Sequence, residues 1–289
     1  MEMNLVKLIE DFQSEEKCRD YMEALRWPEG VCCPRCQSAS ISQIQDRGQY
    51  DCNECRYQFS VTSGNVFHDT HLPLWKWFLA VYIMCESKKS VSANQIKRTL
   101  GISYKTAWYL CHRIRKAMQE SEPLNGVIEV DEAFIGGKSH GKTGRGARKT
   151  GVVGMVERGG RVQLETIAKM DSASLVKFIE SHLGKNVKMV ITDGLPAYSK
   201  VDAIAPHKAV NKKGGEVTSD DNINAIENVW SLLKRSLIGS FHQVSAKHLP
   251  AYLNEVAFRF NNRANPNLFR DTMQRLLVGE HITFQQLAA

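Results

Sequence analysis

The stretch GVIEVDEAFIGG, residues 126–137, combines an apolar strand pattern with three acids. Its β-branched and aromatic residues favour an extended strand. Side chains alternate along a strand, so Glu129 and Asp131 share one face and Glu132 points to the other. A carboxylate in an apolar strand needs a partner, because burial removes its hydration. The stretch therefore predicts a strand that carries a functional acid at Asp131.

Strand and helix patterns continue from this stretch toward the C-terminus. The expected elements are a strand hairpin over 151–170, a helix over 172–184, strands over 187–193 and 203–210, and long helices over 222–237 and 248–263. Three strands in series, then a helix, a strand and terminal helices, predict an α/β layer domain.

Two further acids occupy positions that suit a catalytic group. Asp193 ends an apolar strand just before a glycine, where catalytic side chains are common. Glu227 lies at the edge of the apolar stripe of helix 222–237, so we expect it to face the protein. The next residue, Asn228, is rotated about 100° further around the helix. Each acid alone suits a structural salt bridge, but the set of two strand acids and one helix acid favours a shared site.

Three converging carboxylates repel one another unless cations lie between them. Mg²⁺ prefers such oxygen ligands, and two ions about 4 Å apart can activate a nucleophile and stabilise a leaving oxygen. The acids therefore predict a catalytic site with Mg²⁺ or Mn²⁺, two ions in all, held by Asp131, Asp193 and Glu227.

Four of the eight cysteines form two C-x-x-C pairs, CPRC at 33–36 and CNEC at 52–55. Converging pairs of this kind supply the four thiolates of a structural zinc site. A redox dithiol or buried free thiols are the alternatives, and Cys32 is a possible substitute for Cys33. The predicted ligands of one Zn²⁺ are Cys33, Cys36, Cys52 and Cys55.

Helix patterns over 92–100 and 103–119 are joined by the short turn LGIS, with Ser92 and Ser103 as expected N-caps. This is the layout of a helix-turn-helix, whose second helix enters the major groove of DNA. An ordinary solvated helix is the alternative. The second helix contributes the expected DNA contacts Lys105, Arg113, Arg115 and Lys116.

Two more groups of basic residues are expected near the acids. A Gly-rich loop, 136–151, carries five Lys or Arg residues and no acid, and it follows Asp131 closely. It suits either guidance of a phosphate backbone or a solvated hairpin. The expected DNA contacts in this loop and after Glu227 are Lys142, Arg145, Arg148, Lys149, Lys234 and Arg235.

The composition excludes some classes of protein. The chain has 289 residues, of which 43% are hydrophobic and 24% charged, as in soluble globular proteins. Its longest apolar run, 72–85, is too short to span a membrane, and the acidic N-terminus does not suit a signal peptide. We therefore expect a cytoplasmic protein without a membrane partner. The net charge of +7 favours an acidic partner such as nucleic acid.

These motifs together resemble the DDE insertion-sequence transposases with an N-terminal zinc ribbon, insertion-sequence family fifteen-ninety-five. The resemblance covers nearly the whole chain, through CPRC…CNEC, SYKTAWYLCHRIRKAM, VIEVDEAFIGGK, VITDGLPAY, NAIENVWSLLKRSL and EVAFRFNNR. It implies a ribonuclease H-like catalytic domain whose acidic triad falls on Asp131, Asp193 and Glu227. One departure is Asn222, where the family often has a histidine five residues before the glutamate.

The resemblance implies an enzyme that binds the ends of its insertion sequence and carries out metal-dependent cleavage and transfer of DNA strands. The partners would be double-stranded DNA, as element ends and target, and further copies of the chain in a homodimer or larger assembly. A DNA-binding regulator with an inactive catalytic layer and a metal-dependent nuclease that does not join strands are the alternatives. The expected domains are 1–30 helical, 31–65 zinc ribbon, 70–121 helix-turn-helix-like and 125–289 catalytic.

Overall fold

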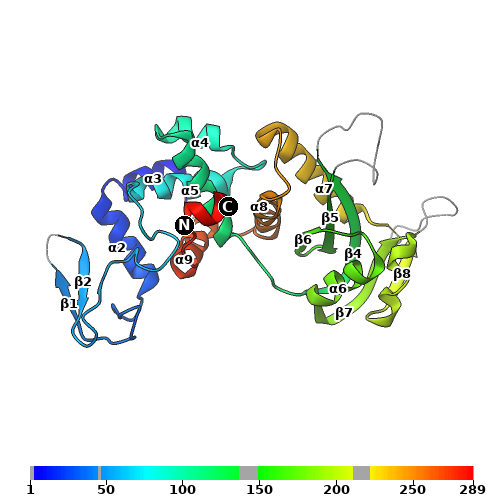
Figure 1. The fold of residues 1–289 in the computed structure, drawn as a ribbon, viewed down its shortest axis with the longest axis horizontal. Coiled ribbons are helices and arrows are strands. Elements are labelled where there is room, and N and C mark those ends of the chain that lie inside the picture. Colours follow the sequence, from blue (N-terminus) through cyan, green and yellow to red (C-terminus); the bar gives the residue numbers. More distant parts are fainter. Residues whose placement is uncertain (1–2, 45–46, 137–148, 211–221, 289) are drawn as a thin grey trace. The chain divides into compact units, whose positions relative to one another are not determined.

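The computed structural model describes residues 3–44, 47–136, 149–210 and 222–288. The chain forms two compact units, which we call the helical unit (Met1–Met118 with Ala264–Ala289) and the α/β unit (Gln119–Arg263). Within the described residues, no helix has the length and apolar character needed to cross a membrane. Figure 1 shows both units and labels many of their elements.

A five-stranded sheet forms the centre of the α/β unit, in the order β6-β5-β4-β7-β8. The strands are β4 (Leu124–Ile135), β5 (Thr150–Glu157), β6 (Val162–Ile167), β7 (Leu183–Asp193) and β8 (His207–Val210). Pairing is antiparallel from β6 through β5 to β4, and parallel from β4 through β7 to β8. Three antiparallel strands followed by two parallel ones confirm the predicted ribonuclease H-like α/β domain.

Helices cover both faces of this sheet. On one face, α7 (Asn224–Ser236) and α8 (Leu249–Asn261) bury an apolar core against β4, β5 and β6. On the other, α6 (Ser172–His182) packs with the short 3-10 turns η2 (Pro196–Tyr198) and η3 (Val201–Ala203). The predicted stripe of α7 is confirmed, since Ile223, Ile226, Trp230 and Leu233 are buried. A π-helical turn, η4 (Leu237–Phe241), follows α7.

The buried acid Glu129 fastens α7 to the sheet. Its Oε2 accepts hydrogen bonds from the backbone N–H groups of Ala225 and Ile226 at 2.8 and 3.1 Å. These are unpaired donors at the start of the helix, where a negative charge is also favoured by the helix dipole. Arg158 completes the pair, with its Nε 2.8 Å from Glu129 Oε1 and its Nη2 2.7 Å from the Asn222 carbonyl oxygen. Asp131 also faces α7, which confirms the prediction that it shares a strand face with Glu129.

The helical unit contains α1 (Leu5–Asp11), α2 (Glu15–Arg26), α3 (Leu74–Glu86), α4 (Ala93–Leu100) and α5 (Tyr104–Ala117). The N-cap predictions are confirmed, since the side chains of Ser92 and Ser103 accept hydrogen bonds from the backbone N–H groups of Gln95 and Thr106. A separate three-stranded antiparallel sheet consists of β1 (Ile41–Ile44), β2 (Gln49–Cys52) and β3 (Gln58–Phe59).

The predicted end of the catalytic domain is wrong. After Arg263 the chain belongs to the helical unit, where it forms α9 (Leu268–Val278) and α10 (Phe284–Ala288). The physical reason is an aromatic cluster: the ring of Phe269 lies 5.9 Å from that of Phe78 and 6.3 Å from that of Phe12. Burial of these rings outweighs continuity with the preceding helix, and residues 264–289 complete the helical core.

Substitution of Glu129 by alanine should lower the free energy of unfolding by about 3–5 kcal/mol, because it leaves Arg158 and two helix N–H groups without their buried acceptor. Urea denaturation of the purified chain measures this. Glu165→Ala is the matched control, since Glu165 is exposed on β6 and its loss should change stability by about 0.5 kcal/mol or less. Equal effects of the two substitutions would contradict the role given to Glu129.

Candidate functional site

Two strand acids meet on the neighbouring interior strands β4 and β7, at the point where β7 ends. β4 and β7 are parallel neighbours, with Glu129 opposite Ile191 and Val130 opposite Thr192. Asp131 and Asp193 are the next residues in this register, and Asp193 is the last residue of β7. Parallel neighbours place the carboxyl ends of their strands together, so the two acids lie side by side. Their side chains are neither fully buried nor fully exposed.

A third acid, Glu132, joins this pair although it starts on the other face of β4, as predicted. Carboxylate oxygens of Asp131, Glu132 and Asp193 all lie within 4.8 Å of one another. Glu132 is nevertheless held from the opposite side of the sheet, because the hydroxyl of Tyr198 donates to its Oε2 at 2.8 Å. The alternation rule gives the face from which a side chain starts, but the neighbouring strand β7 ends at Asp193, and beyond that end a glutamate on β4 is long enough to bring its carboxylate to the other two.

Asp131 is fixed by the helix that covers it. The indole Nε1 of Trp230 donates to its Oδ2 at 2.9 Å. Gly154, which pairs with Asp131 across β4 and β5, makes room for this ring, since a Cβ at that position would lie 2.7 Å from the indole. No sequence pattern pointed to Gly154 or Trp230 as parts of the site.

Electrostatics at this cluster favours a bound cation. Burial raises the pKa of Asp131 to about 6, the charges of Glu132 and Asp193 act in the same direction, and the Trp230 hydrogen bond opposes them. Burial and the neighbouring Glu132 also raise the pKa of Tyr198, which therefore remains a hydrogen-bond donor. Three carboxylates that crowd their oxygens together, with the ionisation of Asp131 opposed by its surroundings, are suitable ligands for a divalent metal ion.

The helix acid Glu227 lies at the rim of the cluster. It sits in the first turn of α7 and is exposed, so the expectation that it faces into the protein is wrong. The inward positions are taken by Ile226 and Trp230, because the buried stripe is centred on them. Glu227 still lines a hollow of about 540 Å³ together with Asp131 and Glu132. The oxygens of Asp131, Glu132 and Asp193 therefore form the tight group, and the exposed Glu227 lines the hollow beside them.

Basic side chains near this hollow differ from one another. Lys234, which follows Glu227 by seven residues on α7, is exposed and lines the hollow. Arg235 is also exposed, and its Nε donates to the carbonyl oxygen of Ser231. Lys149 is half-buried just before β5. The predicted contacts Lys142, Arg145 and Arg148 lie outside the described residues.

The four predicted zinc ligands converge. Cys33 Sγ lies 3.6 Å from Cys55 Sγ, Cys36 Sγ lies 3.5 Å from Cys52 Sγ, and all four are within 4.8 Å of one another. Tetrahedral zinc with bonds of about 2.3 Å separates its sulfur ligands by about 3.8 Å, so the four thiols fit zinc. Burial raises the pKa of the Cys33 thiol, but the N–H groups of Cys36 and Arg35 outweigh this and bring it to about 7. Cys32 is not in the group.

The predicted basic face of α5 is only partly accessible. Lys105 and Lys116 are exposed, whereas Arg113 and Arg115 are buried, so the prediction that these two arginines face DNA is wrong. Arg113 donates to the carbonyl oxygens of Val66 and His68, and Arg115 to that of Val91. Their guanidinium groups satisfy loop carbonyls inside the unit, a role that a basic helix pattern does not distinguish from phosphate contact.

The sheet order defines the class of the α/β unit, a ribonuclease H-like domain, with an acidic cluster beside the end of β7. Comparison with protein families gives two matches, the ISXO2-like transposase domain over residues 123–261 and the transposase zinc-ribbon domain over residues 13–58. The chain belongs to this family of insertion-sequence transposases with an N-terminal zinc ribbon.

Three individual proteins or complexes are similar to this chain at low sequence identity. An uncharacterized protein in transposable element ISH50 of Halobacterium salinarum is 28% identical over 275 residues, which span 87% of this chain and 92% of that protein. Among solved structures, the HTLV-2 integrase catalytic core domain with magnesium is 15% identical, with 48% of this chain and 86% of that chain covered and a TM-score of 0.29. The Mos1 strand transfer complex is 10% identical, with 70% and 75% covered and a TM-score of 0.31.

Substitution Cys36→Ser should reduce the zinc content of the purified chain from about one ion to well below one, because a hydroxyl is a poor replacement for a zinc-bound thiolate. Elemental analysis after purification without chelator measures it. Cys32→Ser is the matched control, since Cys32 adjoins Cys33 in sequence but lies outside the group of four thiols. Full zinc in Cys36→Ser, or equal loss in both variants, would contradict this ligand set.

Proposed function

We propose that this chain binds the ends of its insertion sequence and catalyses metal-dependent cleavage and transfer of DNA strands. The observation that carries the proposal is the convergence of Asp131, Glu132 and Asp193 beside the end of β7, with Glu227 across the same hollow. Membership of a transposase family supports it. Trp230 and Tyr198 orient Asp131 and Glu132 toward this cluster by hydrogen bonds.

The acids Asp131, Glu132 and Asp193 would hold Mg²⁺ or Mn²⁺, with Glu227 as a further ligand from the rim. Two such ions supply activation of a nucleophile and stabilisation of the leaving oxygen in phosphoryl transfer. The chain's own residues orient the site: Trp230 fixes Asp131, and Tyr198 fixes Glu132. Lys234 lies at the same hollow and is placed to contact a phosphate of the bound strand.

DNA contact is assigned to the exposed part of α5. Its first turn, with Ser103 as N-cap, presents Tyr104 and Lys105 to solvent, and Lys116 is exposed nearer its end. In a helix-turn-helix the N-terminal residues of the second helix contact base edges. Since transfer of an element requires both of its ends, the proposal includes a homodimer or larger assembly on DNA, which the mass of the protein–DNA complex in solution would measure.

Asp193→Asn and Glu227→Gln should each lower cleavage of a duplex carrying the element ends by on the order of a thousandfold, because several kcal/mol of transition-state stabilisation depends on anionic metal ligands. Affinity for the same duplex should remain, since the substitutions keep side-chain volume and leave the helical unit unchanged. Gel assays with Mg²⁺ measure cleavage and joining, and the same assays without metal measure binding.

Asn228→Ala is the control for the helix acid, because Asn228 adjoins Glu227, is exposed and does not line the hollow.

Glu132→Gln tests whether Glu132 is a metal ligand or only a structural residue, because it retains an acceptor for Tyr198 but loses the charge. We expect it to remove the thermal stabilisation by Mg²⁺, about 2.7 kcal/mol for wild type at a hundred times the dissociation constant. Cleavage by Asp193→Asn at the wild-type rate would refute the mechanism. Binding without cleavage by wild type would identify a regulator, and cleavage without joining would identify a nuclease.

Lys105→Gln and Lys116→Gln should weaken DNA binding and each lower the slope of log affinity against log salt by about 0.9, the value for one lost phosphate contact. Neither should change the melting temperature, because both side chains are exposed. Arg113→Gln should instead lower stability by about 2 kcal/mol or more, because two buried carbonyl oxygens lose their donor. An unchanged salt slope in both lysine variants would place DNA contact elsewhere on the chain.

A further inference from the structure

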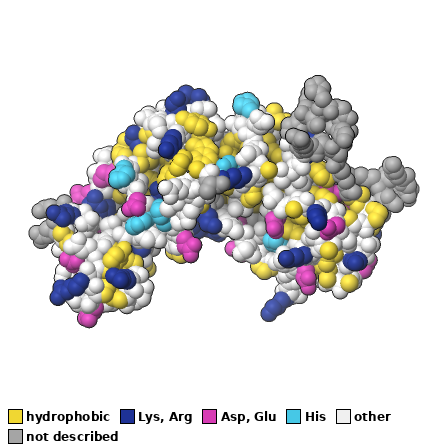
Figure 2. Space-filling view, in the orientation of Figure 1, with side chains coloured by type: hydrophobic (Ala, Val, Ile, Leu, Met, Phe, Trp, Pro, Cys, Tyr) yellow, Lys and Arg dark blue, Asp and Glu magenta, His cyan; other side chains and the backbone are white. Residues whose placement is uncertain are grey.

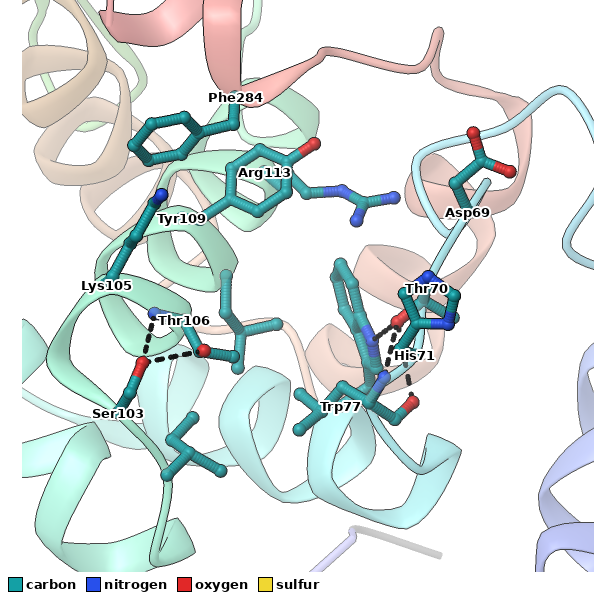
Figure 3. A pocket seen from close by; sticks show the side chains of 13 residues that line it. Asp69, Thr70, His71, Trp77, Ser103, Lys105, Thr106, Tyr109, Arg113 and Phe284 are labelled. Carbon is teal, nitrogen blue, oxygen red and sulfur yellow. Dashed lines mark hydrogen bonds between the residues drawn. The ribbon is translucent and has the colours of Figure 1, made fainter.

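A second hollow of about 540 Å³ opens on the helical unit beside the start of α5. Figure 3 shows Lys105, Thr106 and Tyr109 of α5 on one side and Thr70, His71 and Trp77 across from them. In the space-filling view, hydrophobic side chains gather with Lys, Arg and His side chains over the region of α4, α5 and α10 (Figure 2). Neither the zinc ligands nor the acidic cluster takes part in this hollow.

Three aromatic rings line it and are held in fixed positions: Trp77 is almost fully buried, whereas Tyr109 and Phe284 are partly exposed. The guanidinium carbon of Arg113 lies 4.9 Å from the ring centre of Trp77 and 5.0 Å from that of Tyr109. The Trp77 Nε1 donates to Thr70 Oγ1 at 2.9 Å, which fixes the indole further. Because Arg113 is itself anchored on two loop carbonyls, the rings are arranged before any ligand arrives.

The C-terminal segment supplies the third ring. Tyr109 donates its hydroxyl to the carbonyl oxygen of Ile282 at 2.6 Å, which brings α10 against α5. The ring of Phe284 then meets that of Tyr109 edge to face, with centroids 5.7 Å apart. Lys105 Nζ lies 4.4 Å from the centre of the Phe284 ring. No pattern in the sequence connects the last residues of the chain with the start of α5.

The lining matches one kind of ligand. Lys105 and Arg113 provide two positive charges against one negative charge, Asp69, and Ser103 and Thr106 provide hydroxyl groups. A flat ring that stacks on aromatic walls and carries an adjacent anion fits these features, and the volume is in the range of about 300–1,000 Å³ for ligand pockets. Stacking of a base on aromatic side chains tolerates any sequence, because every base has a π face.

We propose that this hollow binds one unpaired nucleotide of the DNA, with its base against Tyr109 and Phe284 and its phosphate at Lys105. The proposal rests on the proposed function, because it takes DNA as the partner of α5. Ser103 and Lys105 begin the helix whose first residues are assigned to the DNA groove, so a nucleotide that leaves the duplex there lies near the opening. Unstacking costs least for a nucleotide that is already unpaired.

The test uses the full-length, zinc-loaded chain and two DNA probes: a blunt duplex and the same duplex with one unpaired thymidine at a 3′ end. Fluorescence anisotropy gives the ratio of the two dissociation constants. We expect wild type to bind the second probe about tenfold more tightly, as one stacked base implies. Phe284→Ala should remove this preference and leave affinity for the blunt duplex unchanged.

Two matched variants accompany it. Gln285→Ala changes the neighbouring exposed residue of α10 and should retain the preference. Thr106→Phe places a ring in the hollow from an exposed position and should remove the preference without lowering the melting temperature. This second variant keeps the proposal falsifiable if Phe284→Ala does not fold.

Equal binding of both probes by wild type would overturn the nucleotide site and leave the DNA-binding function intact. Absence of binding to either probe would overturn the DNA-binding function, and the nucleotide site with it. If Phe284→Ala instead dissociated a dimer in sedimentation while the probe preference persisted, the hollow would be an interface between copies of the chain, and the nucleotide site would be refuted.

Discussion

The buried carboxylate of Glu129 is the contact on which the geometry of the α/β unit depends. It accepts hydrogen bonds from two backbone N–H groups at the start of α7 and forms an ion pair with Arg158. Arg158 in turn donates a hydrogen bond to the Asn222 carbonyl oxygen. A buried charge is costly unless every lone pair is satisfied, so this arrangement allows one position of the helix start relative to β4. The place of Trp230 above Asp131, and of Glu227 at the rim of the hollow, follows from it.

The acidic cluster combines rigid support with unfavourable charge. Asp131 and Glu132 start on opposite faces of β4, and each is held by a neutral donor, Trp230 or Tyr198. Neutral donors orient the oxygens, while burial, and to a smaller extent the charges of Glu132 and Asp193, raise the pKa of Asp131. A site of this kind is organised before a cation binds, and the cation relieves the repulsion.

The helical unit is stabilised by different means. The ribbon has a small core, in which Phe59 packs against Tyr50 and Trp27, and four thiols suited to zinc complement it. Elsewhere in the unit, α9 returns from the far end of the chain to complete an aromatic cluster, and Arg113 joins loop carbonyls to aromatic rings. The contacts of Arg113 with Trp77 and Tyr109 also build the hollow beside α5, so a residue that stabilises the unit also shapes a surface next to its exposed basic turn.

Local patterns in the sequence determined the elements and the chemistry of the site. Spacing alone indicated the zinc ligands, the N-caps Ser92 and Ser103, the buried stripe of α7 and the strand acids Asp131 and Asp193, because each depends on residues close together in the chain or on strand alternation. Only the tertiary structure decided which acid completes the cluster, since the reach of Glu132 beyond the end of β7 depends on Tyr198, sixty-six positions away. It likewise decided that Arg113 and Arg115 turn inward and that residues after Arg263 join the helical unit. A basic or apolar pattern shows that a side chain needs a partner, but the identity of that partner is fixed by packing between segments distant in sequence.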